Sequence, residues 1–183
     1  PGDTARGAGE AESIRAMVAH LVATRGLDPA RVHVTGLSAG GAMAATMLAT
    51  HPEVFAAGAI IAGLPHGAAA SMPEAFEAMA SGRPRGADER ARQVRDAAPH
   101  HRRSGTPWPR VAIWHGEADT TVRPVNAEEL AKQWTALHGL DARAPSRTET
   151  LGAARRQVWL DTAGREVVEV TMLPGLAHGV PIH

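Results

Sequence analysis

The chain has 183 residues, a length that suits one domain with a sizeable core rather than two full domains. Nineteen Lys and Arg residues balance nineteen Asp and Glu residues, so the formal net charge is zero and a nucleic-acid partner is not expected. The sequence has no uninterrupted stretch of about 18 apolar residues, the length needed to span a membrane. Pro1 to Thr4 show no signal-peptide pattern. The absence of cysteine excludes disulfides, thiolate zinc sites and thiol nucleophiles.

The first part of the chain predicts helices that alternate with strands. Apolar residues recur at three- and four-residue spacing over 10–25, which predicts an amphipathic helix that ends before Gly26. The short β-branched stretch 31–35 predicts a strand, and the Ala- and Met-rich stretch 43–50 predicts a helix. The continuous apolar run 56–62 predicts a strand buried on both faces, as in a parallel sheet.

The second part continues the same alternation. After a Gly- and Pro-containing loop it predicts helices at 73–80 and 88–98, a connector at 99–109, a strand at 110–114, a helix at 126–138, and strands at 157–160 and 166–173 joined by a turn at 161–164. Helices alternating with strands predict the α/β class with a largely parallel sheet. We expect a single domain over 1–183, in which 64–109 forms an insertion or lid-like segment beside the active site.

A candidate nucleophile lies where the strand 31–35 meets the next helix. Gly36-Leu37-Ser38-Ala39-Gly40 fits the pattern G-x-S-x-G in the strand–turn–helix context that a serine nucleophile requires. We expect Ser38 to be the nucleophile, the Ala39 N–H to stabilise an oxyanion, and both flanking glycines to allow close approach of strand and helix. The alternative is a glycine-rich turn in which the serine is only a helix N-cap.

A serine nucleophile needs a base, and the base needs a carboxylate that orients it. In an α/β-hydrolase the chain order is serine, acid, histidine. Asp119 follows the strand 110–114 at the end of the sheet where sites of parallel sheets form, so we expect it to be the acid. Glu117 is the competing candidate, and the alternative role for Asp119 is to cap the amide of Thr121 or Val122.

The chain contains ten histidines, and we expect His178 to be the base. It lies in a Gly-flanked loop after the last strand. Among the other histidines after the acid, His138 ends a helix, where a C-cap is expected, and His183 is terminal. His115 precedes a glycine at a strand end and is expected only to shape its loop.

With these residues in place, the chain resembles the polyhydroxybutyrate depolymerase and feruloyl esterase type of carbohydrate esterase family 1. The resemblance is carried by Val122, Asn126 and the stretches 28–43, 61–67, 114–119 and 174–178. It implies an α/β-hydrolase esterase with Ser38 as nucleophile, Asp119 as acid and His178 as base. It also implies no metal or cofactor, and a secreted or periplasmic location.

Two departures from the family pattern affect the expectation. Family members often carry cysteines around 67–72 and 76–79, where this chain has Ala and Glu, so no disulfide is expected there. The family domain also begins upstream, with strands and a loop that supplies the second oxyanion donor, and residues 1–9 match neither. We therefore expect the chain to be the C-terminal portion of a longer domain, with the nucleophile strand at a bare edge of the sheet.

The function expected is that of a serine carboxylesterase, with Leu37, His66 and Trp114 as substrate-pocket candidates and core packing as the alternative for Trp114. One alternative function is a serine peptidase similar to the prolyl oligopeptidases, which the stretch 61–67 fits less well. The other is a catalytically silent polymer-binding module, against which a complete triad argues. Polyester, feruloylated or acetylated sugars and short-chain esters all remain open as substrates, as does the oligomeric state.

Overall fold

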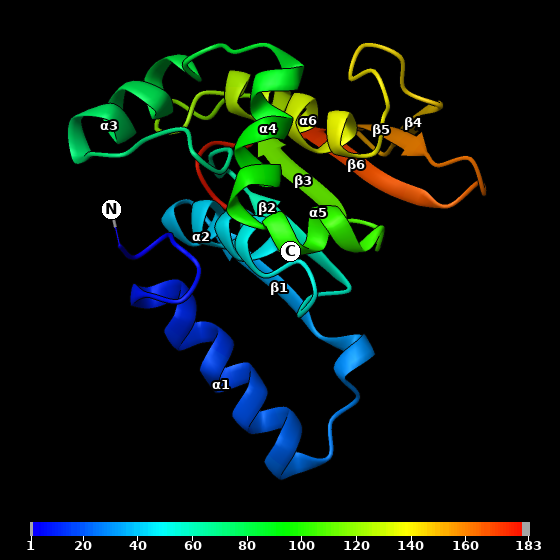
Figure 1. Ribbon diagram of the computed structural model, residues 1–183. Coiled ribbons are helices and arrows are strands. Elements are labelled where there is room, and N and C mark those ends of the chain that lie inside the picture. The colour runs from blue at the N-terminus through cyan, green and yellow to red at the C-terminus, as the bar shows by residue number, and fades with distance from the viewer. Residues whose placement is uncertain (1, 181–183) are drawn as a thin grey trace.

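A computed structural model describes residues 2–180 and contains one mixed sheet (Figure 1). Its strands lie in the order β1-β2-β3-β6-β5-β4, with β1 to β3 and β6 parallel and β5 and β4 antiparallel to their neighbours. The strands are β1 (His33–Leu37), β2 (Ala57–Ile61), β3 (Arg110–Gly116), β4 (Arg147–Leu151), β5 (Ala154–Leu160) and β6 (Glu166–Leu173). The fold is therefore α/β with a mostly parallel sheet, as predicted.

Most helices form a layer on one face of this sheet (Figure 1). The helices are α1 (Gly9–Arg25), α2 (Ala39–Thr50), α3 (Met72–Ser81), α4 (Ala87–Ala97), α5 (Pro99–Ser104) and α6 (Val125–Leu137), with a short 3-10 turn at Pro29–Arg31. Helix α2 packs on β1 and β2, α6 packs on β3 and β6, and α4 packs against α6. None of the helices within residues 2–180 is long and apolar enough to cross a membrane.

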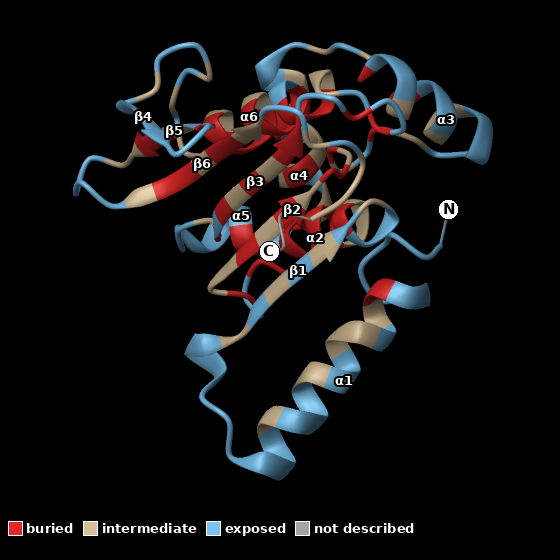
Figure 2. Cartoon of the chain, turned by 180° about the vertical axis from the view of Figure 1, so that it is seen from behind, coloured by how far each residue is buried: buried red, intermediate tan, exposed pale blue. Residues whose placement is uncertain are grey.

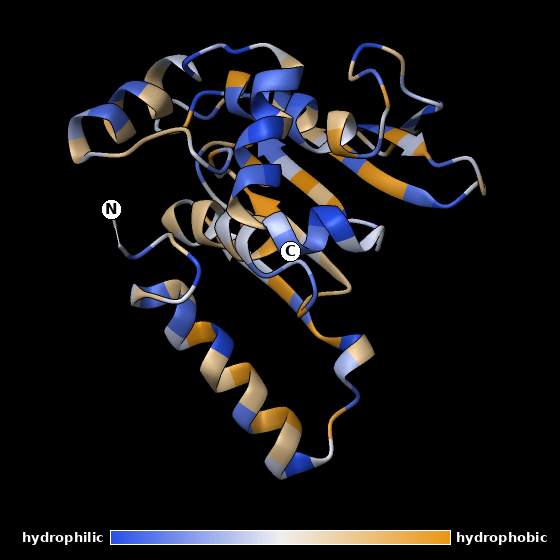
Figure 3. Ribbon diagram, viewed as in Figure 1, coloured by the Kyte–Doolittle hydropathy of each residue, from blue (hydrophilic) through white to orange (hydrophobic). Residues whose placement is uncertain are grey.

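The core lies between the helices and the central strands. Ile60, Ile113 and Val170 project from neighbouring strands on one face and are buried against α2 and α6. Figure 3 shows the hydrophobic residues concentrated on β3 and β6, in the middle of the sheet. Small residues let the layers approach closely, since a Cβ on Gly58 would lie 2.7 Å from the Leu48 side chain. An Ala-rich helix and a glycine in the strand therefore bring helix and sheet into close contact.

Helix α1 is amphipathic only in part. Ile14 and Val18 pack against the core, as the periodicity predicts, but Met17 and Leu21 of the same predicted face are 58% and 47% exposed. Figures 1 and 2 show why: the helix leaves the body of the molecule after its first turns, and its last turns are largely exposed. The strand that follows, β1, lies at an edge of the sheet and pairs only with β2 among residues 2–180.

Two elements have no counterpart in the sequence prediction. Strand β4 is polar along Arg147–Leu151 and lies at the other edge of the sheet, so no apolar alternation marked it. Helix α5 lies inside the predicted connector 99–109 and is polar nearly throughout. It begins with a proline and is held by His101, whose Nε2 lies 3.2 Å from the Pro107 carbonyl and whose ring packs on Trp108.

The segment 64–109 forms part of the helical layer. Ala91 and Val94 of α4 are fully buried in the core, which the sequence, with its few apolar signals in this region, did not indicate. An ion pair with no exposed side-chain surface joins Arg90 Nε to Glu129 Oε2 of α6 at 3.0 Å. The same guanidinium donates to the carbonyls of Gly82 and Arg83. The segment is thus anchored to α6, and its lid-like role stays a prediction.

Candidate active site

Ser38 is the single residue between a strand and a helix, and its backbone has a conformation that an L-residue rarely adopts. β1 ends at Leu37 and α2 begins at Ala39, four residues earlier than predicted, and the serine between them has φ 58° and ψ −119°. Such a backbone costs of the order of 1–3 kcal/mol and is typical of a serine held at a strained strand-to-helix turn. Ser38 occupies the N-cap position of α2, but its side chain makes no capping hydrogen bond to the helix.

Two glycines make this turn possible, and only one of them, Gly36, is among the two that were expected. A Cβ on Gly36 would lie 2.1 Å from the Gly40 carbonyl oxygen, and one on Gly41 would lie 2.7 Å from the Ile61 carbonyl oxygen. A Cβ on Gly40 would meet nothing within 4 Å, so the expectation that a glycine is needed there for close approach is wrong. The strand and helix therefore come together over Gly36 and Gly41. As at any helix N-terminus, the first N–H groups of α2, beginning with that of Ala39, have no acceptor within the helix itself. These groups lie next to Ser38 in the chain.

Asp119 is buried in the turn that follows β3, with 1% of its surface exposed. Its Oδ1 accepts hydrogen bonds from the N–H groups of Thr121 and Val122, both at 2.9 Å, while its Oδ2 lies 2.7 Å from Nδ1 of His178. One oxygen therefore caps the turn and the other faces the histidine, so the capping role does not compete with the expected role as acid, which stays a prediction. Burial by itself would raise the pKa of Asp119, but the hydrogen bonds from His178, Val122 and Thr121 lower it below its usual range.

The loop that carries His178 is joined to the Asp119 turn by its backbone. The N–H of Glu117 donates to the Leu173 carbonyl at 3.0 Å, and the N–H of Ala118 donates to the Leu176 carbonyl at 3.0 Å. A Cβ on Gly116 would lie 2.2 Å from that same Leu176 oxygen, so only glycine fits there. The side chain of Glu117 is exposed, whereas Asp119 is the carboxylate beside the imidazole.

A second histidine lies behind the acid. His115 is 1% exposed, and its Nε2 lies 2.8 Å from the Val122 carbonyl oxygen and 3.6 Å from Asp119 Oδ2. Burial lowers the pKa of His115, which keeps it neutral. Sequence reasoning gave this residue a role only in the shape of the loop, and its position directly after an apolar strand was the one signal that it would be buried.

The structure brings together two of the three predicted catalytic side chains by hydrogen bonding. Within residues 2–180 no hydrogen bond joins Ser38 Oγ to His178, so the contact between nucleophile and base stays a prediction. His138 lies at the C-cap of α6, as expected, and the terminal His183 lies outside the described residues. No group of three or more His, Asp or Glu side chains in the described chain could hold a metal ion.

The three substrate-pocket candidates lie on opposite sides of the sheet. Leu37 and Trp114 flank Ile61 in one row across β1, β2 and β3, where Leu37 is 38% exposed and Trp114 is half-buried. His66 lies on the helical side, with Nδ1 3.4 Å from the Thr46 hydroxyl of α2. The structure therefore does not gather these candidates into one pocket.

Thr46 and His66 line a cavity of about 580 Å³ that extends along α2 from Ala42. His66 is fixed there by Gln133 of α6, whose carboxamide accepts from the His66 N–H and donates to its carbonyl, both at 2.9 Å. Burial lowers the pKa of His66 to about 4. A neutral imidazole therefore forms part of the cavity wall at neutral pH.

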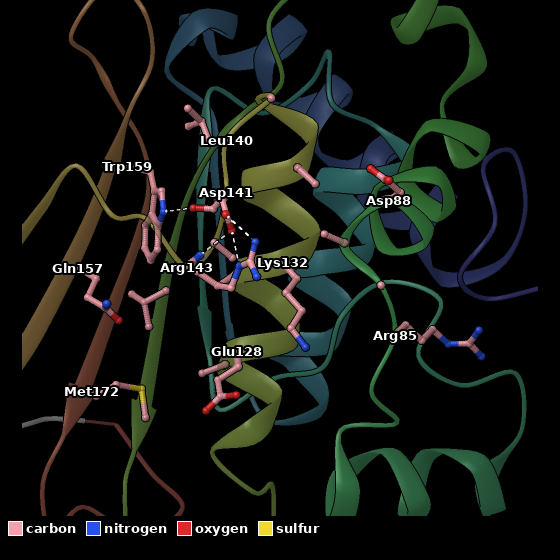
Figure 4. Close-up of a pocket in the computed structure, with 18 of the residues that line it drawn as sticks. Arg85, Asp88, Glu128, Lys132, Leu140, Asp141, Arg143, Gln157, Trp159 and Met172 are labelled. Carbon is pink, nitrogen blue, oxygen red and sulfur yellow. Dashed lines mark hydrogen bonds and ion pairs between the residues drawn. The ribbon is translucent and has the colours of Figure 1, made fainter.

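Another cavity, of about 910 Å³, runs along α6 towards β5 and the loop that follows α6 (Figure 4). Trp159 closes one side, and its Nε1–H donates to the Asp141 carbonyl at 2.9 Å. The Asp141 carboxylate in turn pairs with Arg143 at 3.0 Å. Neither Ser38, Asp119 nor His178 lines this groove, so it is separate from the candidate catalytic residues.

Comparison with known proteins gives the same picture over almost the whole chain. Residues 2–158 match the family model described as esterase PHB depolymerase. Poly(3-hydroxyalkanoate) depolymerase C of Paucimonas lemoignei is 41% identical, over all of this chain and 43% of its own length. Acetylxylan esterase A of Aspergillus oryzae is 34% identical, over 98% of this chain and 59% of its own length.

A solved structure agrees with these relatives. The acetyl xylan esterase from Aspergillus awamori superimposes with a TM-score of 0.87 at 30% identity, covering 98% of this chain and 65% of that one. The fold is that of the α/β-hydrolase esterases, and the chain spans about half the length of the curated relatives it matches. By sequence, by fold and by the serine turn with its neighbouring acid–histidine pair, the chain belongs to the esterase PHB depolymerase family.

Proposed function

We propose that this chain carries the catalytic residues of a serine carboxylesterase, with Ser38 as nucleophile, His178 as base and Asp119 as acid. The observation that carries the proposal is the buried Asp119 carboxylate, which accepts from His178 Nδ1 at 2.7 Å at the end of the sheet where Ser38 lies. A carboxylate can only accept a hydrogen bond, so Nδ1 carries the proton and Nε2 is free to act as a base.

The chemistry follows from this tautomer. Ser38 Oγ attacks the ester carbonyl carbon while His178 Nε2 takes the hydroxyl proton, and the N–H of Ala39 stabilises the resulting oxyanion. The tetrahedral intermediate collapses when His178 returns the proton to the departing alkoxide, which releases the alcohol and leaves an acyl-serine. Water then attacks the acyl group with His178 again as base, and the acid is released. Asp119 stabilises the imidazolium in both steps.

The substrate class proposed is a carboxylic ester, small or polymeric. It is supported by relatives named for depolymerisation of poly(3-hydroxyalkanoate) and for acetylxylan esterase activity, whose common chemistry is ester hydrolysis. Membership in an esterase family argues against the peptidase alternative, and the buried acid–histidine pair argues against a silent binding module. The family resemblance also leads us to propose a secreted or periplasmic location.

Covalent labelling of the whole protein that carries this chain tests the proposal. A fluorophosphonate should modify the wild-type protein at Ser38 and should not modify Ser38→Ala, while p-nitrophenyl acetate hydrolysis should fall by several orders of magnitude. Ser13→Ala is the matched control, because that exposed serine only donates to the Gly9 carbonyl. Undiminished labelling of Ser38→Ala, or an unlabelled wild-type protein, would refute the assignment.

A further inference from the structure

His115 is a buried histidine that the proposed reaction does not use. It is the penultimate residue of β3, its side chain has no exposed surface, and its Nε2 lies 3.6 Å from Oδ2 of the equally buried Asp119 carboxylate. A buried imidazole is costly unless its nitrogens are hydrogen-bonded, so its partners indicate what holds it there.

The contacts of His115 fix its tautomer. A carbonyl oxygen can only accept, so the 2.8 Å contact with the Val122 carbonyl requires the hydrogen on Nε2. Nδ1 is buried without a hydrogen-bond partner in the described chain, which suits a nitrogen that carries no hydrogen. The charged groups that face the ring are Asp119, at 3.6 Å, and His178 beyond it. Burial lowers the pKa of His115 and outweighs the Val122 carbonyl and Asp119, which raise it, while His178 lowers it further. The ring is a neutral donor through Nε2.

This donor closes the turn that holds the acid. The Val122 N–H donates to Asp119 Oδ1, and the Val122 carbonyl accepts from His115 Nε2. Val122 is 2% exposed, so without His115 its carbonyl would be left buried and unpaired. The turn would then tilt to bring the Val122 carbonyl to another donor. This tilt would carry Oδ1 of Asp119 away from its backbone donors and Oδ2 away from His178.

We propose that His115 is a positioning residue for the esterase reaction, acting through Val122 and Asp119 on the orientation of His178. The inference rests on the proposed function, because it gives His178 the role of base. It differs from a role in packing, since it depends on a hydrogen-bond donor at the position of Nε2 and not on a side chain of suitable volume.

Substitutions of His115 separate these two roles. In His115→Gln the side-chain amide nitrogen reaches about the position of Nε2, whereas in His115→Asn it reaches only that of Nδ1, and His115→Leu has no donor. We expect His115→Gln to keep kcat within about threefold of wild type, and the other two variants to lose about 10- to 100-fold in kcat with little change in KM. His101→Leu is the matched control, because His101 also faces a backbone carbonyl but lies in α5, away from the site.

The hydrogen bond between His178 Nδ1 and Asp119 gives a readout that does not depend on turnover. Nuclear magnetic resonance should show the Nδ1 proton of His178 at the downfield position of a hydrogen bond to a carboxylate in wild type and in His115→Gln. That resonance should shift upfield or be lost in His115→Asn and His115→Leu, because Asp119 no longer faces the ring.

The outcomes distinguish this inference from the proposed function. If His115→Gln is as impaired as His115→Leu, or if His115→Asn keeps the wild-type kcat and the wild-type Nδ1 proton resonance of His178, a positioning role is refuted. An inactive, unlabelled wild-type protein in which that resonance still responds to these variants would instead refute the esterase assignment and leave His115 as the residue that positions Asp119. Comparing Gln with Asn keeps the test valid if the leucine variant does not fold.

Discussion

Asp119→Asn is the substitution whose outcome the structure defines most sharply. The two carboxylate oxygens have different partners: Oδ1 accepts from the Thr121 and Val122 N–H groups, and Oδ2 accepts from His178. An asparagine has one acceptor and one donor group at these positions. Its oxygen must face the two backbone donors, because the reverse orientation would point an amide NH₂ at two N–H groups.

The size of the effect follows from that choice. The reverse orientation leaves donors of the turn unpaired, at about 1–3 kcal/mol for each buried one. The amide NH₂ therefore faces His178 Nδ1, which must become an acceptor, so the imidazole hydrogen moves to Nε2 and the ring cannot take the serine proton. A histidine held in the wrong tautomer by this exchange loses about 10⁴-fold in kcat, which corresponds to about 5.5 kcal/mol in the activation barrier.

The assay is steady-state hydrolysis of p-nitrophenyl acetate by the whole protein at pH 7, with thermal unfolding as the check on folding. Glu117→Gln is the matched control: it makes the same chemical change two residues earlier, at an exposed side chain, and should retain kcat within about twofold. A variant Asp119→Asn with near wild-type kcat, or a Glu117→Gln variant that loses activity, would refute Asp119 as the acid.

Three further predictions concern stability. Arg90→Met removes a buried partner of Glu129, which keeps only Lys132 and the Arg85 N–H, so urea unfolding should show a loss of about 1–3 kcal/mol, and an unchanged stability would contradict the argument. Gly36→Ala should destabilise the protein by about 2 kcal/mol or more, because its Cβ meets a backbone oxygen, while Gly40→Ala should be neutral or stabilising in the same assay. The pKa of His66 is lowered to about 4 in the folded state from an unfolded value near 6.5, so its contribution is complete above pH 6.5 and is lost as the pH falls towards 4. The free energy of unfolding should drop by about 2 kcal/mol more in wild type than in His66→Gln between pH 7 and pH 5, and equal drops would contradict that pKa.

The sequence predicted the central sheet and the catalytic loops because both depend on local patterns. Continuous apolar runs specify β2 and β3, and the glycines around Ser38 and His178 specify where the chain must turn. The choice of Asp119 over Glu117 as the carboxylate beside His178 also agrees with the structure, since the turn that buries Asp119 is closed by its own side chain. Features that a local sequence pattern marks could be predicted in this way.

Features that depend only on contacts with residues far away in the chain, with no local pattern to mark them, could not be predicted from the sequence. Nothing local shows that Arg90 pairs with Glu129, so α4 was interpreted as part of an insertion or lid-like segment. The separation of His66 from Leu37 and Trp114 follows from the path of the loop after β2, which passes to the helical side and is fixed there by Gln133. His115 was underestimated for the same reason, because its partner Val122 becomes a neighbour only when the turn closes.

The acid and the base belong to one pair of strands, whereas the nucleophile lies across the sheet from them. β3 and β6 pair up to Gly116 and Leu173, and the Glu117 N–H continues that ladder, so the Asp119–His178 contact is built by adjacent segments. β1 is separated from β3 by β2, about 10 Å away at the usual strand spacing.

What ties Ser38 to the pair is the backbone beyond the strand ends. The Ser38 N–H donates to the Ile61 carbonyl, and the Ala62 N–H donates to the Trp114 carbonyl, both at 2.9 Å. The position of the nucleophile relative to His178 is therefore set by the register of β1 on β2 and of β2 on β3. Because a register shift of one residue would turn each side chain to the opposite face, the distance from Ser38 to the base is a property of the sheet and not of either loop alone.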